Sequence, residues 1–208
     1  MHYLRNITLL TCALLLGFGG MAPEAPAQDD IASVIEKMQT RDQEIKAIID
    51  AHPDTTDTSF RTELKEIVNK DFDFLELSTR ALGRYWREHT EAEQQEFVDV
   101  FSQIVRNSSV RKLDVYKADR IEYGEPVLRG STLTVPTTVF KKDANKTIEY
   151  KMHQVDGQWR MYDLVIDEVS TYRNYRDAFY KEIKKNGWTS MLDKLKKRLA
   201  EDEEADTL

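Results

Sequence analysis

The side chains that most often perform chemistry are few in this chain and too scattered to form a site. The histidines are His2, His52, His89 and His153, and none of them has the spacing of a metal-binding motif. The sequence contains no phosphate-binding loop, no dinucleotide-binding glycine motif and no nucleophile elbow. We therefore expect no metal site, no cofactor and no catalytic residue of these kinds.

Asp163 is the residue whose surroundings come nearest to acid–base chemistry. It falls within an expected strand, Gln158–Glu168, on the same face as Trp159, Met161 and Val165. A carboxyl group among apolar neighbours has a raised pKa, which would suit the general acid or base of a small secreted hydrolase. The alternative is structural: the strand twists, or a helix terminus donates hydrogen bonds to the carboxylate. We favour the structural role.

Three arginines form the second candidate group. Arg80, Arg84 and Arg87 recur at helical intervals beside Tyr85 and Trp86. They could form a cationic rim over an apolar opening, where they would contact a phosphate head group or a partner. They could equally lie on a solvated helix face, stacked on the aromatic rings. The spacing alone leaves both interpretations open.

Length and composition limit the class of protein. The chain has 208 residues, of which 40% are hydrophobic and 32% charged, with a formal net charge of −7. This length suits one domain with a sizeable core. An acidic balance argues against nucleic acid as a partner, because phosphate binding needs a basic face.

The first 27 residues have the pattern of a cleavable signal peptide. Arg5 precedes an apolar run from Ile7 to about Met21, and Ala25-Pro26-Ala27 fits the cleavage site. The only cysteine, Cys12, lies inside this segment. We therefore expect an exported mature protein that contains no disulfide bond.

The spacing of apolar residues predicts helices at both ends of the mature chain. A capping pattern, Asp73 with Glu76, begins the third helix, and Thr90 with Glu93 begins a long fourth one. Gly187 interrupts the C-terminal helical pattern. The expected helices cover residues 29–50, 60–68, 73–83, the stretch after Thr90, 172–183 and 188–199. Residues 201–208 are expected to form an acidic, disordered tail.

Between these helices the period changes to that of strands. Leu133, Val135 and Val139 alternate with polar residues, and Asp156-Gly157 is a strong hairpin signal. Pro136 indicates that its strand lies at an edge or carries a bulge. We therefore predict a single α+β domain, residues 28–200, with a helical layer packed on a twisted antiparallel sheet of about four strands.

Two blocks of motifs stand out in order along the chain. The first comprises Phe72-Asp73-Phe74, Leu82-Gly83-Arg84-Tyr85-Trp86-Arg87, and Thr90 with Gln94 or Gln95 and Phe97. The second comprises Asp156-Gly157-Gln158-Trp159, Tyr162-Asp163, Val169-Ser170 and Asn174-Tyr175-Arg176. In these motifs the chain resembles the MlaC family, also called the toluene-tolerance family, from about Ile31 to Leu199. Two positions depart from the family pattern: Glu168 stands where Gly is common, and Ser109 where Tyr is common. The second departure could widen or reshape a cavity.

The resemblance implies a periplasmic carrier that binds phospholipid acyl chains in an apolar cavity between helices and sheet. It implies transfer of lipid, by a monomer, between an inner-membrane ABC transporter complex and an outer-membrane lipoprotein complex. A hopanoid or other lipid is the variant ligand within the same family. A purely structural adaptor with a filled core is the remaining alternative, and the aromatic residues alone favour a filled core over a cavity.

The expected lipid-binding residues are apolar positions on the predicted helices and strands. They are Phe74, Leu77, Leu82, Trp86, Phe97, Phe101, Val105, Val139, Tyr150, Met152, Trp159, Met161 and Val165.

Overall fold

The computed structural model describes residues 28–52, 59–111, 118–142 and 144–207, so the expected signal peptide lies outside it. The first helices are α1 (Gln28–Ala51), α2 (Ser59–Asn69), α3 (Phe74–Leu82), the 3-10 helix η1 (Gly83–Glu88) and α4 (Glu91–Arg111). Strands β1 (Arg120–Tyr123), β2 (Val127–Arg129), β3 (Thr132–Lys141), β4 (Ala144–Val155), β5 (Gln158–Ile166) and β6 (Val169–Ser170) follow, and α5 (Thr171–Thr207) completes the chain. No helix in these ranges has the length and apolar character needed to cross a membrane.

Both predicted capping patterns are present. The Asp73 carboxylate accepts a hydrogen bond from the Glu76 backbone N–H at 2.9 Å, at the start of α3. Ahead of α4, the Thr90 backbone N–H donates to Glu93 Oε2 at 2.8 Å and the Glu93 N–H donates to Thr90 Oγ1 at 3.3 Å. Gln94 then donates from Nε2 to the carbonyl of Trp86 at 2.8 Å, which fixes η1 against α4. These bonds satisfy backbone groups that a helix terminus leaves without partners.

The C-terminal helix differs from the expected pair of helices and tail. Gly187 adopts φ 86° and ψ 171°, and it bends α5 where the sequence predicts a break. The prediction of a disordered tail is wrong for residues 201–207, because α5 continues to Thr207. Lys197 and Glu201 form an ion pair at 3.7 Å, one turn apart, which supports the helix beyond residue 200.

The sheet has six strands in the order β1-β3-β4-β5-β6, with β2 also paired to β3, and every pairing is antiparallel. Asp156 and Gly157 both have positive φ, 51° and 75°, as the predicted hairpin turn between β4 and β5 requires. The edge position expected from Pro136 is wrong. β3 is an interior strand, and Pro136 lies opposite the gap between β1 and β2. No residue of either strand pairs with Pro136, so its lack of an N–H removes no hydrogen bond from these ladders.

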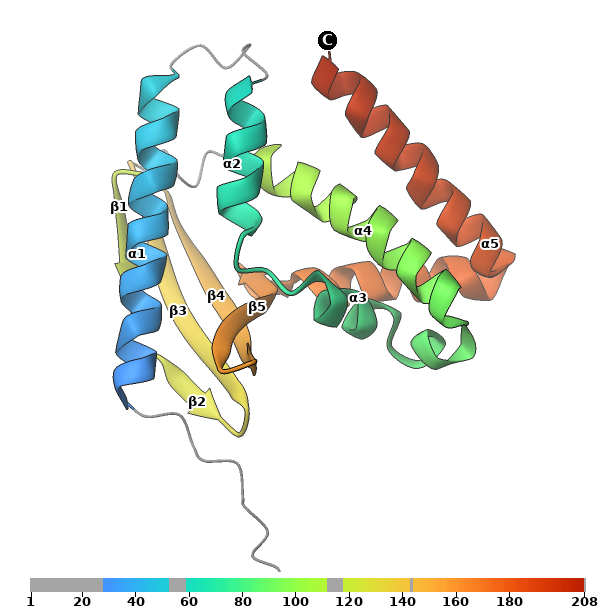
Figure 1. Ribbon diagram of the computed structural model, residues 1–208, viewed down its shortest axis with the longest axis horizontal. Helices are drawn as coiled ribbons and strands as arrows, with labels where there is room; N and C mark the ends of the chain where they lie inside the picture. The colour runs from blue at the N-terminus through green and yellow to red at the C-terminus, as the bar shows by residue number, and fades with distance from the viewer. Residues whose placement is uncertain (1–27, 53–58, 112–117, 143, 208) are drawn as a thin grey trace, which may run out of the picture.

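The helices do not form one continuous layer over the sheet. Figure 1 shows α1 lying across one face of the sheet, while α3, α4 and α5 form a separate helical unit beside β5. One core cluster joins α3, α4 and α5, and includes Leu77, Phe97 and Phe179. A second joins α1 to the sheet through Met38 and Val135. A third joins α1, α2 and the end of α4.

Gly83, at the end of α3, offers a direct test of close packing in the helical unit. Its φ is 52°, and a Cβ placed there would collide with the Tyr180 hydroxyl, which accepts a hydrogen bond from the Arg84 N–H at 3.0 Å. Gly130 has a similar φ of 59° with nothing near its Cβ position. We predict that Gly83→Ala lowers the free energy of unfolding by roughly 2 to 3 kcal/mol, and Gly130→Ala by only about 1. Urea denaturation measures both, and equal effects would contradict the packing argument.

Candidate functional site

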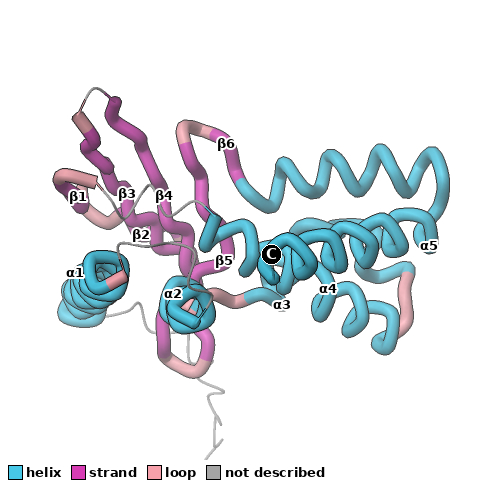
Figure 2. The backbone as a smooth tube through the Cα atoms, turned by 90° about the horizontal axis from the view of Figure 1, so that it is seen from above, coloured by secondary structure: helices cyan, strands magenta, loops and turns pink. Residues whose placement is uncertain are grey.

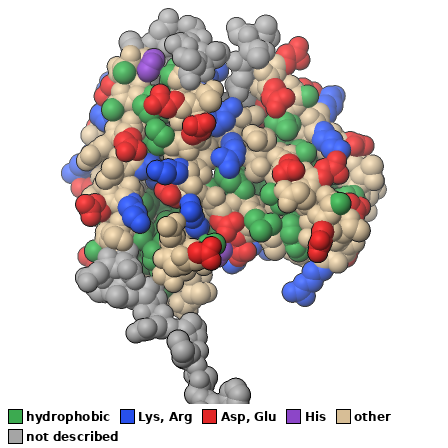
Figure 3. Space-filling view, viewed as in Figure 1, with side chains coloured by type: hydrophobic (Ala, Val, Ile, Leu, Met, Phe, Trp, Pro, Cys, Tyr) green, Lys and Arg blue, Asp and Glu red, His purple; other side chains and the backbone are tan. Residues whose placement is uncertain are grey.

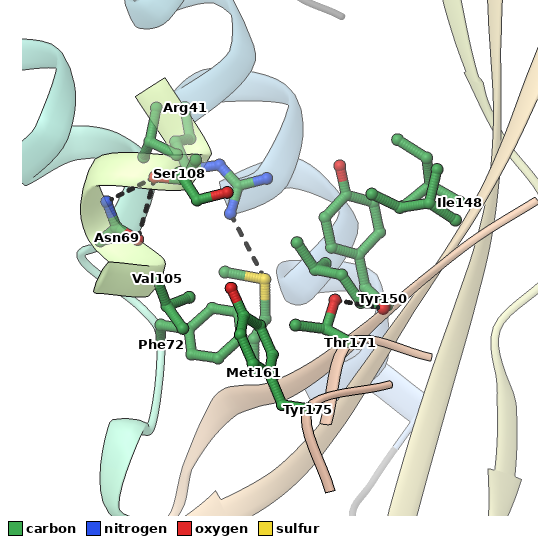
Figure 4. Close-up of a pocket in the computed structure, with 14 residues that line it drawn as sticks. Arg41, Asn69, Phe72, Val105, Ser108, Ile148, Tyr150, Met161, Thr171 and Tyr175 are labelled. Carbon is green, nitrogen blue, oxygen red and sulfur yellow. Dashed lines mark hydrogen bonds between the residues drawn. The ribbon is translucent and has the colours of Figure 1, made fainter. Parts of the chain in front are cut away.

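An apolar cavity of about 120 Å³ lies where the three core clusters meet. Its wall is assembled from every layer of the fold. The helices contribute Val68 from α2, Val105 from α4 and Tyr175 from α5, and Phe72 comes from the link before α3. The strands contribute Ile148 and Tyr150 from β4 and Met161 from β5 (Figure 4). Leu164 and Ile166 of β5 complete this side of the wall.

Phe72 reaches this wall because its segment runs alongside β5. The Met161 N–H donates to the Asp71 carbonyl at 2.8 Å, and the Asp73 N–H donates to the Met161 carbonyl at 2.6 Å. Phe72 and Met161 therefore form a parallel bridge that attaches the start of the helical unit to the sheet. The same segment places the aromatic ring of Phe72 against the cavity.

One end of the cavity wall is polar. Asn69 is 3% exposed and donates from Nδ2 to the Lys65 carbonyl at 2.7 Å and to Ser109 Oγ at 3.0 Å. Ser109 in turn donates to the Arg106 carbonyl at 2.7 Å, so these groups join α2 to α4 and satisfy one another. Ser109 lines the cavity, so its small side chain leaves space that a tyrosine at this position would fill.

Arg41 from α1 is the charged residue of the cavity wall. It is 6% exposed, and its guanidinium points towards Met161 and Tyr150 (Figure 4). Nη1 donates to Met161 Sδ at 3.6 Å, and the guanidinium carbon lies 5.7 Å from the centre of the Tyr150 ring. Nη2 lies 3.4 Å from an oxygen of Asp42, whose other oxygen accepts from the Tyr123 hydroxyl.

The structure brings three of the predicted lipid-binding residues to this cavity: Val105, Tyr150 and Met161. Met152 and Trp159 line a neighbouring hollow between α1 and the β4–β5 turn, and Arg41 lines both spaces. Val139 belongs to the core that joins α1 to the sheet. The cavity therefore lies closer to the sheet than the sequence pattern suggested.

The predicted residues of α3, η1 and the first half of α4 pack in the helical core instead. Phe97 and Phe101 stack with ring centres 5.3 Å apart, and each meets the ring of Phe179 edge-on at 5.5 and 5.2 Å. The remaining members of this group are Phe74, Leu77, Leu82 and Trp86, and none of them lines the cavity. These residues pack against one another in a filled core, as the alternative interpretation of the aromatic residues expects.

Val165 lies on the opposite face of β5 from the one predicted, because the strand carries a bulge. Met161 pairs with Met152 but Asp163 pairs with Lys151, so Tyr162 is an extra residue. Beyond it, Leu164 and Ile166 face the cavity, while Val165 lines a different hollow that includes Pro136. Strict alternation from Trp159 therefore selects the wrong face after Met161.

The arginines predicted as a head-group rim do not border the cavity. Arg80 pairs with Glu76 at 2.6 Å and lies 4.1 Å from the centre of the Tyr162 ring. Arg84 lies over the rings of Tyr85 and Tyr180, at 4.9 and 5.0 Å from their centres. Arg87 is exposed on η1. For Arg80 and Arg84, the structure shows stacking on aromatic rings.

Sequence reasoning missed Arg41, although a signal was present. Met38, Arg41 and Ile45 follow one another at helical spacing, so Arg41 is a cation on the apolar face of α1. It missed Leu164 and Ile166 because the bulge at Tyr162 has no evident signature in the sequence. A charged residue within an apolar stripe was therefore the most useful clue to the site.

The histidines in the described ranges have structural neighbours. His153 Nε2 lies 2.9 Å from Asp73 Oδ2, His52 stacks on Phe60, and His89 stacks on Trp188. No group of three potential metal ligands occurs among the residues that the structure describes.

Asp163 joins the sheet to α5. It is fully buried, and it accepts hydrogen bonds from Ser170 Oγ at 2.7 Å and from the Tyr172 N–H at 3.2 Å. Burial raises the pKa of its carboxyl group, and this effect outweighs that of the hydrogen bonds, which lower the pKa. Asp163 does not line the cavity. The N-terminus of α5 donates a hydrogen bond to its carboxylate, which is the structural arrangement offered as the alternative to acid–base chemistry.

The fold and cavity define an α+β protein with an apolar internal space between its helices and its antiparallel sheet. The sequence profile described as "MlaC protein" matches residues 33–197, and the chain therefore belongs to the MlaC family.

A solved structure with the same fold is that of a phospholipid-binding protein from Ralstonia solanacearum in complex with a phospholipid. The TM-score is 0.70 at 20% sequence identity, and the match covers 80% of this chain and 97% of that chain. At this identity the likeness shows the shared fold. A comparison with curated proteins gives no match.

The raised pKa of Asp163 gives a pH prediction of defined sign. Between the ordinary carboxyl pKa and the raised one, the folded state binds more protons than the unfolded state, so stability falls as pH rises through this window. We predict that the free energy of unfolding of the wild type, relative to Asp163→Asn, decreases as the pH rises above about 4, the ordinary carboxyl pKa. Urea denaturation at a series of pH values measures this difference. A relative stability that rises with pH would show that the hydrogen bonds outweigh the burial.

Proposed function

We propose that this protein is a periplasmic lipid carrier that binds phospholipid acyl chains in the cavity between its sheet and its helices. The observation that carries the proposal is the apolar cavity at the meeting point of all three core clusters, in a chain of the MlaC family. The phospholipid bound by the Ralstonia solanacearum protein of the same fold supports the choice of ligand. The signal-peptide pattern of residues 1–27 supports export.

The physical case for a carrier rests on the cost of exposing acyl chains to water. Two chains carry about 30 methylenes, and at ~0.8 kcal/mol each their exposure costs roughly 24 kcal/mol. A protein that carries such a lipid through water must therefore enclose the tails almost completely. In this proposal the chain accepts lipid from one membrane complex and delivers it to the other, between an inner-membrane ABC transporter complex and an outer-membrane lipoprotein complex.

The cavity must enlarge to hold two acyl chains. A volume of about 120 Å³ is close to that of an engineered apolar cavity of about 150 Å³ that holds one benzene molecule. Each of the three core clusters is packed internally, and each contributes residues to the cavity wall. Separation of the α3–α4–α5 unit from the sheet would therefore enlarge the space, and it would also move Val110 of α4 relative to its partners in the third cluster. The parallel bridge between Phe72 and Met161 and the β6–α5 corner would remain as the connections.

Two other functions give different experimental outcomes. A hopanoid or other polycyclic lipid would use the same cavity with a rigid ligand. A small secreted hydrolase would need Asp163 near the substrate, and the hydrogen bonds from Ser170 and Tyr172 occupy that carboxylate instead. The identity and the chemical integrity of the bound molecule separate these cases.

We predict that native mass spectrometry of the mature protein, purified without detergent, shows a co-purifying lipid with intact ester bonds. Lipid extraction and tandem mass spectrometry identify it as a phospholipid or as a hopanoid. Preparations that remain free of lipid, and that take up none from phospholipid vesicles, would refute the carrier. Cleaved lipid that stays intact with Asp163→Asn would favour the hydrolase.

Adjacent residues of β5 provide a matched test of the cavity. Leu164 lines the cavity and Val165 lies on the other face of the strand, and both are partly buried. We predict that Leu164→Gln weakens phospholipid binding about tenfold, because an amide in the cavity loses its hydration when the acyl chains enter. Val165→Gln should leave binding unchanged. Fluorescent-lipid titration measures both variants, with circular dichroism as the check on folding, and an equal loss in both would place the site elsewhere.

A further inference from the structure

The cavity adjoins a second hollow of different character, and Arg41 separates the two. The hollow has a volume of about 150 Å³ and lies between α1 and the turn that joins β4 to β5. Lys37, Asp71, Gln158 and Trp159 contribute to its lining, so it is far more polar than the cavity. Arg41 lines both spaces, and the Met161 sulfur that its Nη1 contacts belongs to the cavity wall.

The order of these spaces matches the order of groups in an amphiphilic molecule. An apolar chamber is followed by a buried guanidinium and then by a polar hollow. A phospholipid has acyl chains, then an anionic phosphodiester, then a polar head. Lys37 lies one helical turn before Arg41, so both cations project from the same side of α1 into the hollow.

We propose that Arg41, assisted by Lys37, binds the phosphodiester of the carried lipid, with the tails in the cavity and the head in the hollow. This inference rests on the proposed function and deepens it by assigning the anionic group of the ligand to named residues. Arginine suits the task because its planar guanidinium forms paired hydrogen bonds to phosphate oxygens. Nη1 now donates to the Met161 sulfur at 3.6 Å, and sulfur is a weak hydrogen-bond acceptor. A phosphate oxygen in its place would be a stronger acceptor.

The acidic residues near this position leave room for an anion. Asp42 contacts Nη2 at 3.4 Å and also accepts from the Tyr123 hydroxyl, and both residues line a separate hollow beside β1 and not the cavity. Asp71 lines the hollow but lies 3.8 Å from Nη1 of Arg160, which offsets its charge. Arg41 and Lys37 are the cations that line the hollow, and Asp71 is the acidic residue of its lining. Arg41 is the one that also faces the apolar chamber.

The test compares two lipids that differ only in the phosphate-bearing head. Delipidated mature protein is incubated with mixed micelles containing equal amounts of phosphatidylglycerol and diacylglycerol with identical acyl chains. Native mass spectrometry then gives the ratio of the two complexes. The wild type should prefer phosphatidylglycerol by more than about tenfold, and Arg41→Gln should reduce this ratio about tenfold while diacylglycerol binding persists.

Control variants separate head-group binding from structural damage. Arg80→Gln removes a surface arginine that does not border the cavity and should leave the ratio unchanged. Arg41→Lys should restore part of the preference. Lys37 is exposed, so Lys37→Gln keeps the test valid if Arg41→Gln fails to fold, and it should lower the ratio about threefold.

Several results would overturn the inference. These are a wild type that binds both lipids equally, an equal loss of both lipids in Arg41→Gln, or an unchanged ratio in folded Arg41→Gln or Lys37→Gln. Displacement of phosphatidylglycerol by millimolar glycerol 3-phosphate would likewise indicate a site for free anions. A wild type that takes up neither lipid would instead refute the proposed function itself.

Discussion

Stability is lost wherever a protein leaves apolar space unfilled, and this constraint organises the whole structure. An apolar void costs about 24 cal/mol per Å³, so a cavity of about 120 Å³ corresponds to roughly 3 kcal/mol. The fold offsets this cost by packing each neighbouring cluster densely. Leu77, Phe97 and Phe101 are fully buried on the helical side, and Leu133 and Val135 on the sheet side. The unfilled space is thereby confined to the junction between complete cores.

The junction is held by polar contacts as well as by apolar ones. Asp163 and Ser170 connect β5 to the first turn of α5, and His153 connects β4 to the Asp73 cap of α3. These hydrogen bonds depend on direction, so they position the helical unit relative to the sheet without filling the space between them. A glutamate at φ 67°, Glu168, occupies the turn before β6, in the left-handed region that favours glycine.

The parts of this structure that follow from local chemistry were predictable, and the parts that follow from register were not. The caps at Asp73 and Thr90 and the turn at Asp156-Gly157 depend on neighbouring residues, and all three are present. The face of β5 could be read correctly only as far as Met161, because the bulge at Tyr162 arises from pairing with β4. Likewise, the apolar spacing of α4 shows that Phe101 is buried, but not whether rings or a ligand would surround it.

The helical unit is discontinuous in the chain, and this affects how the protein can be made. α3 and α4 precede the sheet, whereas α5, which completes their core through Phe179, Met191 and Leu195, is the last element of the chain. When the chain is synthesised or exported from its N-terminus, the apolar faces of α3 and α4 stay exposed until the whole sheet and then α5 have followed. Closure of this core is therefore a long-range event that entails a large loop entropy and slow assembly. During this interval, the same apolar surfaces are open to chaperones and to aggregation.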